Sequence, residues 1–264
     1  FVNDSFFRDY TFDNFLTYQN TFADDHNFTV LLGMSAFKTS GEFYNFTGRD
    51  VPGTTFAEAT LDGAGEVIDA RDISGPAEFD QRLLSYFTRV QYNYKERYLL
   101  SAVLRRDGSS NFGPENKFGY FPSASIGWVA SDEPFFGSSD LLNFLKLRAS
   151  YGILGNDRIG AFGYVSTLNA EGTYVFDNEL VNGVAAGQLS NPEIKWERQK
   201  TFDVGFDARL FNNRIDLTMD YFKRRTDDLL LVPQVSGILG VYAPGAGAPI
   251  VNAGSVENQG LEFS

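Results

Sequence analysis

The segment Asp107–Gly113 is the part of the sequence that most resembles a cation site. It reads Asp-Gly-Ser-Ser-Asn-Phe-Gly, and protein Ca²⁺ sites use oxygen ligands at alternate positions of a loop. The bidentate Glu that closes an EF-hand loop would fall at Phe118, which has no ligand atom. A tight polar loop is therefore the favoured interpretation, and no metal site is predicted.

Three pairs of adjacent carboxylates are the next candidates for chemistry: Asp24-Asp25, Asp132-Glu133 and Asp227-Asp228. A glycosidase needs two carboxylates that face one sugar across about 5 to 9.5 Å. Adjacent residues of a strand point to opposite faces, and these pairs fall at the ends of predicted strands. We therefore interpret them as solvated loop charges.

Nucleophilic and phosphate-binding sites find no support either. The single His, His26, lies in a short polar turn, where we expect it to be exposed and without triad partners. Gly152–Asn156 follows a strand but opens no helix, which a phosphate loop requires. The absence of Cys excludes disulfides, thiolate metal sites and a Cys nucleophile. The sequence thus predicts no enzyme, no catalytic residue and no cofactor.

The composition points to β-structure. Among 264 residues there are 26 Phe, 13 Tyr and 26 Gly, and aromatics favour strands as Gly favours turns. A net charge of −12 argues against nucleic acid as a partner, because its recognition needs a basic surface. No apolar run reaches the roughly 18 residues of a membrane helix. The last residues, Gly260–Ser264, resemble a strand cut in the middle, so we expect the chain to be part of a longer protein.

Apolar and polar residues alternate with period 2 through most of the chain. Phe202–Leu210 is apolar at its even positions, and Ile215–Tyr221 is apolar at its odd positions. A two-residue turn at Asn212-Asn213 would join them, since Asn tolerates a positive φ. That turn pairs apolar with apolar at every step, from Leu210 with Ile215 to Val204 with Tyr221. The two apolar faces are expected to contact lipid.

The same alternation predicts about nine strands of roughly 10 to 14 residues, whereas the average soluble strand has about 5 to 6 and a membrane β-strand about 9 to 11. The predicted strands are Tyr10–Gln19, Phe28–Ala36, Leu84–Tyr94, Tyr98–Leu104, Phe118–Trp128, Leu145–Ile153, Trp196–Leu210, Ile215–Tyr221 and a last one near Leu261.

Short and long connections alternate along the chain. The short ones are Ala23–Asn27, Lys95–Arg97, Asp132–Leu142 and Asn212–Asn213. The long ones are Lys38–Gln81, Asp107–Lys117, Gly155–Lys195 and Asp227–Ser255. Short turns on one side and long loops on the other are typical of outer-membrane barrels. The predicted fold is all-β, an antiparallel up-and-down transmembrane β-barrel segment. A soluble β-sandwich that binds glycans or acts as an adhesin is the alternative, and a passive barrel without a plug is another.

Several segments form a series of recognisable motifs: Arg105–Gly113 with Phe118–Trp128, then Leu145–Gly152, Asn191–Glu197 and Asn252–Glu262. In type and order they resemble the motifs of the SusC/RagA family of TonB-linked outer-membrane proteins from Bacteroidetes-type bacteria. This resemblance implies a 22-stranded barrel with a plug domain and a TonB box, a SusD-like surface lipoprotein as partner, and import of an oligosaccharide or peptide.

The resemblance implies that residues 1–264 are part of the barrel wall. The plug domain and TonB box are not present in them, so the TonB complex would be engaged through a segment outside this chain. About nine strands cannot close a barrel of that size, and open sheet edges do not occur in hydrocarbon. We therefore expect one continuous sheet whose first and last strands pair with strands outside this chain. Cargo specificity would depend on the long loops and the plug, and no substrate-binding residue is predicted.

Overall fold

The computed structural model describes residues 2–46, 55, 65, 73–137, 141–160, 163–239 and 247–264. The chain forms two compact units, each considered by itself. One comprises Phe1–Phe12 and Ala36–Leu83, and the other comprises Asp13–Ser35 and Leu84–Ser264. Among the described residues, no helix is both long and apolar enough to cross a lipid bilayer.

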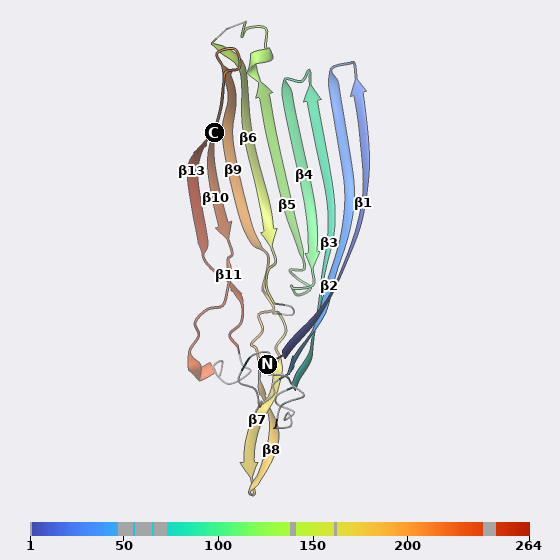
Figure 1. Cartoon of the computed structure of the whole chain (residues 1–264), viewed down its shortest axis with the longest axis vertical. Helices are drawn as coiled ribbons and strands as arrows, with labels where there is room; N and C mark the ends of the chain where they lie inside the picture. The colour runs from blue at the N-terminus through green and yellow to red at the C-terminus, as the bar shows by residue number, and fades with distance from the viewer. Residues whose placement is uncertain are drawn as a thin grey trace. The chain divides into compact units, whose positions relative to one another are not determined.

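Nine strands form one antiparallel sheet in the order β1-β2-β3-β4-β5-β6-β9-β10-β13 (Figure 1). Neighbours in the sheet are neighbours in the chain, apart from two small inserted sheets, so the predicted up-and-down arrangement is confirmed. β1 and β13 stand at opposite ends of that order and do not pair with each other, as expected. The strands are β1 (Val2–Phe22), β2 (His26–Phe46), β3 (Ile73–Tyr94), β4 (Tyr98–Ser109), β5 (Phe118–Val129), β6 (Leu142–Asn156), β9 (Glu197–Leu210), β10 (Ile215–Asp227) and β13 (Ser255–Phe263).

The predicted register of β9 and β10 is confirmed. Leu210 lies opposite Ile215, and Val204 lies opposite Tyr221. The turn itself is wider than predicted, since Phe211 also has a positive φ of 53° and the paired residues enclose four residues rather than two. The wider turn has the same centre, so the register is unchanged.

Several strands run further than their apolar alternation suggested. β2 continues to Phe46 and β3 begins at Ile73, so the predicted loop Lys38–Gln81 starts and ends as strand. Most of its middle lies outside the described residues. β4 likewise continues to Ser109. The alternation pattern did not indicate these strand ends because their residues are largely polar. Backbone hydrogen bonds between strands form without apolar side chains.

Two of the long connections contain strands of their own. β7 (Leu168–Phe176) and β8 (Glu179–Ala186) form a hairpin within the connection between β6 and β9. β11 (Leu230–Leu231) pairs with β12 (Val251–Asn252) between β10 and β13. The β7–β8 hairpin lies at the bottom of Figure 1, away from the Lys95–Arg97 turn at the top. Two 3-10 turns, η1 (Ala130–Asp132) and η2 (Gly237–Leu239), complete the described elements.

One face of the sheet in the larger unit is apolar and exposed. Ile126 is 58% exposed and Leu147 is 41% exposed. Phe202 and Val204 on β9 are exposed as well. A soluble β-sandwich would bury these side chains against a second sheet, so the structure gives that alternative no support.

Candidate functional site

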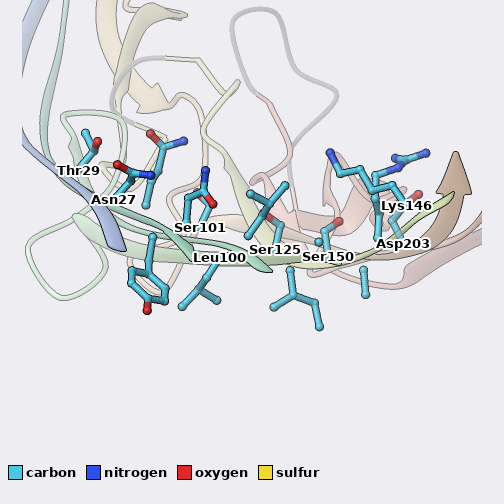
Figure 2. A pocket seen from close by; sticks show the side chains of 16 residues that line it. Asn27, Thr29, Leu100, Ser101, Ser125, Lys146, Ser150 and Asp203 are labelled. Carbon is cyan, nitrogen blue, oxygen red and sulfur yellow. The ribbon is translucent and has the colours of Figure 1, made fainter. Parts of the chain in front are cut away.

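A polar hollow of about 500 Å³ lies against the strands β2 to β9 in the larger unit. Figure 2 shows its labelled polar side chains on one side of the sheet and Leu100 on the other. The labelled polar residues are Asn27, Thr29, Ser101, Ser125, Lys146, Ser150 and Asp203. Because strand residues alternate between faces, the polar residues of each strand gather on the face opposite the exposed apolar side chains.

Four of these residues form a straight row across four strands. Ser101 of β4 lies opposite Ser125 of β5, Ser125 opposite Ser150 of β6, and Ser150 opposite Asp203 of β9. A hydroxyl both donates and accepts hydrogen bonds, and a carboxylate accepts them. This polar row, Ser101–Ser125–Ser150–Asp203, can therefore hydrogen-bond to sugar hydroxyls or peptide amides.

An ion-pair network adjoins the polar row. Arg148 of β6 lies between two carboxylates: its Nε is 2.9 Å from Asp207 Oδ2, and its Nη2 is 3.1 Å from Asp220 Oδ1. Thr218 donates a hydrogen bond to Asp207. The residue opposite Arg148 on β9 is Gly205, and its lack of a side chain lets the guanidinium reach Asp220 on the strand beyond.

Four aromatic and aliphatic side chains form a buried loop core where the long connections leave the sheet. Phe112 and Ile194 are fully buried, and Phe121 and Trp196 are each 5% exposed. The Trp196 ring centroid is 5.0 Å from that of Phe112 and 5.2 Å from that of Phe121. This packing fixes the connection between β4 and β5 against the start of β9.

Asparagine side chains tie the same connections together. Asn111 donates to the carbonyl of Asp157 and Asn191 to that of Ile250. Asn252 exchanges hydrogen bonds with the backbone of Lys195, since its amide donates at 2.8 Å and its oxygen accepts at 2.9 Å. An amide side chain satisfies backbone groups that lack a strand partner. The motif segments Asp107–Gly113 and Asn191–Glu197 thus build the base of the loops.

The segment Asp107–Gly113, interpreted from the sequence as a tight polar loop rather than a cation site, is not an open ligand loop and begins as strand. Asp107 and Ser109 belong to β4 and are buried. Arg105 Nε donates to both carboxylate oxygens of Asp107 at 2.7 Å, and Ser109 Oγ accepts from the backbone of Asn111. Within the described part of the chain, no three His, Asp or Glu side chains lie together as a metal site.

The acidic pairs are divided among separate partners. Asp25 lies 3.5 Å from Lys95, while Asp227 and Asp228 contact different lysines. Glu133 accepts hydrogen bonds from Tyr98 at 2.5 Å and from the Trp128 indole at 3.2 Å. The Tyr98 hydroxyl is the largest cause that holds the pKa of Glu133 below its ordinary value. None of these contacts gives two carboxylates a shared site.

The expectation for His26 was wrong. It is the first residue of β2 rather than a turn residue, and it is half-buried. Its Nδ1 lies 2.7 Å from the Tyr92 hydroxyl, and its ring centroid lies 4.6 Å from that of Tyr94. Both tyrosines belong to the end of β3. The residues next to His26 in the sequence could not predict this contact. Gly152–Asn156 forms the end of β6.

The hairpin β7–β8 carries exposed apolar side chains on both of its faces. Tyr174 is 73% exposed and Phe176 is 70% exposed, and Val175 between them is exposed on the other face. Asp177 and Asn178 form its turn with positive φ values of 51° and 66°. The sequence motifs did not indicate this hairpin, although Asp-Asn between apolar runs is a turn signal.

Residues 1–264 match the family model described as "TonB dependent receptor-like, beta-barrel". The chain belongs to this family. A TonB-dependent receptor, P39 of Formosa agariphila, is 36% identical over 262 residues, which are 98% of this chain and 24% of that protein. The TonB-dependent receptor SusC of Bacteroides thetaiotaomicron is 35% identical over 191 residues, 69% of this chain and 18% of that protein.

Solved structures agree on the fold of this TonB-dependent receptor chain. It is similar to a chain of the RagAB peptide importer in its closed-closed state, with a TM-score of 0.80, 24% identity, and coverage of 99% of this chain and 28% of that one. The siderophore receptor PirA of Pseudomonas aeruginosa gives a TM-score of 0.57 at 11% identity, over 98% of this chain and 39% of that one. The TonB-dependent receptor chain spans about a quarter of the length of the first curated relatives that it matches.

Proposed function

We propose that residues 1–264 supply part of the barrel wall and the surface loops of an outer-membrane importer that TonB drives. The observation that supports this proposal is the difference between the two faces of the sheet in the larger unit. One face has exposed apolar side chains, and the other has the polar row. A bilayer covers such an apolar face, and a polar face of this kind lines a water-filled lumen. The plug domain and the TonB box would lie in a segment outside residues 1–264.

The proposed cargo is an oligosaccharide or a peptide. Ser101, Ser125, Ser150 and Asp203 present hydroxyls and a carboxylate to the polar hollow, and such groups bind the hydroxyls and amides of either cargo. We assign them to the wall of the transport path. The chain contributes no catalytic residue to this function, because import changes the location of the cargo and not its bonds.

A SusD-like surface lipoprotein is the proposed partner. The name of the RagAB importer indicates a two-component assembly, and SusC is among the relatives. The exposed apolar face of the β7–β8 hairpin, with Tyr174 and Phe176, is suited to a protein contact, since exposed apolar patches of soluble loops mark interaction sites.

Uptake of labelled cargo by intact cells tests the proposed function. Cells that lack the complete receptor are complemented with the wild type or with Asp203→Asn, and uptake of labelled oligosaccharides and peptides is compared with and without dissipation of the proton gradient. We expect uptake that requires the gradient and falls with Asp203→Asn. The matched control is Asp216→Asn, which removes a carboxylate near the short Phe211–Arg214 turn. Uptake that persists without the gradient would indicate a passive barrel instead.

A further inference from the structure

Four basic side chains lie on the same face of the sheet as the exposed apolar residues, at the ends of β9 and β10 that are next to the long connections. They are Arg198 and Lys200 on β9 and Lys223 and Arg225 on β10. On β9 they share the face of Phe202 and Val204, and on β10 they share the face of Tyr221, because strand residues two apart point the same way. We call this group of four the outer cation cluster.

The strand register places the cluster directly beside the apolar band. Lys200 lies opposite Arg225, and the next pair on the same face of the sheet is Phe202 with Lys223. The pair after that, Val204 with Tyr221, is free of charge. The face thus changes from apolar to cationic within two residue pairs, which is about 13 Å along a strand.

The cluster has more positive than negative charge. Lys200 Nζ and Arg225 Nε both contact Asp227, at 2.9 and 2.7 Å. Lys223 pairs with Glu257 at 2.9 Å. The carboxylates of Asp227 and Glu257 therefore balance only two of the four positive charges. Arg198 is exposed, and it has no acidic partner within 4.0 Å in the part of the chain that the structure describes.

We infer that the outer cation cluster binds phosphate groups of lipid headgroups. A lipid whose acyl chains cover Phe202 and Val204 would carry its headgroup at the height of Lys200 and Lys223. Long basic side chains lay their stems along apolar surface and hold the charge at the headgroups, and guanidinium groups bind phosphate oxygens in pairs. The adjoining apolar band selects a lipid over free phosphate, because only a lipid contacts both parts.

The inference rests on the proposed function in one respect, which is that the apolar face lies in a bilayer. It adds a ligand class to the outer surface of the barrel, and it is independent of transport. Lipid binding by the purified receptor therefore remains measurable if the protein proves not to import anything.

Arg224 offers a matched control within the same strand. It is exposed like Lys223 and Arg225 but lies between them and so projects from the opposite face. Replacing Arg224 removes one positive charge from the same strand without touching the outer cation cluster.

The test uses the complete receptor in detergent micelles and native mass spectrometry with lipid A as the probe. The double variant Lys223→Gln/Arg225→Gln is compared with Arg224→Gln and with the wild type, using phosphorylated and dephosphorylated lipid A. We expect the double variant to bind phosphorylated lipid A about 10-fold more weakly, with dephosphorylated lipid A unaffected. Arg224→Gln should match the wild type. Raising the salt concentration should weaken wild-type binding, because exposed charges are screened.

Two results would overturn the inference. Equal binding of phosphorylated and dephosphorylated lipid A by the wild type would exclude phosphate recognition. Displacement of lipid A by millimolar inorganic phosphate would identify a site for the free ion instead. A receptor that stays soluble and folded without detergent would contradict the proposed function itself, and this outcome is seen before any lipid is added.

Discussion

Gly205 of β9 and Asp220 of β10 lie directly opposite each other, and a Cβ on Gly205 would overlap the Asp220 carboxylate. It would also lie 2.6 Å from the backbone oxygen of Met219. The space above Gly205 is thus occupied by the carboxylate that Arg148 contacts from the far side. The glycine is required by this close approach and not by its backbone conformation.

Gly205→Ala is expected to destabilise the receptor by about 1–3 kcal/mol, because overpacking displaces neighbouring groups. Since one of those groups is a backbone oxygen, rotation of Asp220 alone does not relieve the overlap. The denaturation midpoint in detergent micelles measures the change. Gly160→Ala is the control, as nothing lies within 4 Å of a Cβ there. Equal midpoints for the two variants would contradict this account.

Val204→Arg should cost about 2–4 kcal/mol of barrel stability if its face contacts the middle of the bilayer. Asp203→Arg, on the adjacent residue, places the same side chain on the polar face and should cost less. Folding into liposomes followed by urea titration gives both free energies. The reverse order of the two variants would mean that the faces are exchanged.

Trp196→Ala should remove a large part of the loop core. Trp196 is 5% exposed, and truncation of a buried aromatic residue costs about 3–5 kcal/mol. Its indole also donates to the carbonyl of Lys117 at 3.3 Å. We expect faster proteolysis of the long connections, while Tyr174→Ala on the exposed hairpin leaves the rate unchanged. Unchanged proteolysis in Trp196→Ala would show that the loops do not depend on this core.

We propose that the long connections face the cell surface and the short turns face the periplasm. Single cysteines test this orientation, and the chain has none of its own to interfere. Asn178→Cys lies in the β7–β8 turn and should react with a membrane-impermeant maleimide on intact cells. Glu96→Cys lies in the short turn between β3 and β4 and should react only after the outer membrane is permeabilised. Labelling of Glu96→Cys on intact cells would reverse the proposed orientation.

Acid should weaken the η1 turn through Glu133. The Tyr98 hydroxyl holds the pKa of this carboxyl below its ordinary value of 4.5. Because the folded pKa is the lower one, the ionised carboxylate stabilises the fold above about pH 4.5, and this contribution is lost as the pH falls through the folded pKa. Glu133→Gln should therefore flatten the stability profile below pH 4.5. A profile identical to that of the wild type would exclude this role for Glu133.

The sequence by itself determined the strands and their local partners. Alternation between Phe202 and Leu210 and between Ile215 and Tyr221 permitted one register, because a slip by one residue would turn every apolar side chain to the other face. Family resemblance and alternation together predicted a barrel segment of about nine strands, and the main sheet of the described residues has nine. The polar ends of β2 and β3 escaped prediction, since hydrogen bonds between backbones leave no apolar pattern. The β7–β8 hairpin also escaped prediction, although Asp177-Asn178 between apolar runs is a turn signal.

Tertiary structure alone decided which distant residues meet. Trp196 packs on Phe112 and Phe121, and His26 packs on Tyr92, across separations that no local pattern encodes. The row from Ser101 to Asp203 also depends on the tertiary structure, but less strongly. The alternation pattern already places each serine on the polar face of its own strand. These residues become a continuous row only when the registers of four strands are combined. Pairing energies act between neighbouring strands, so alignment across a whole sheet emerges from the assembled fold.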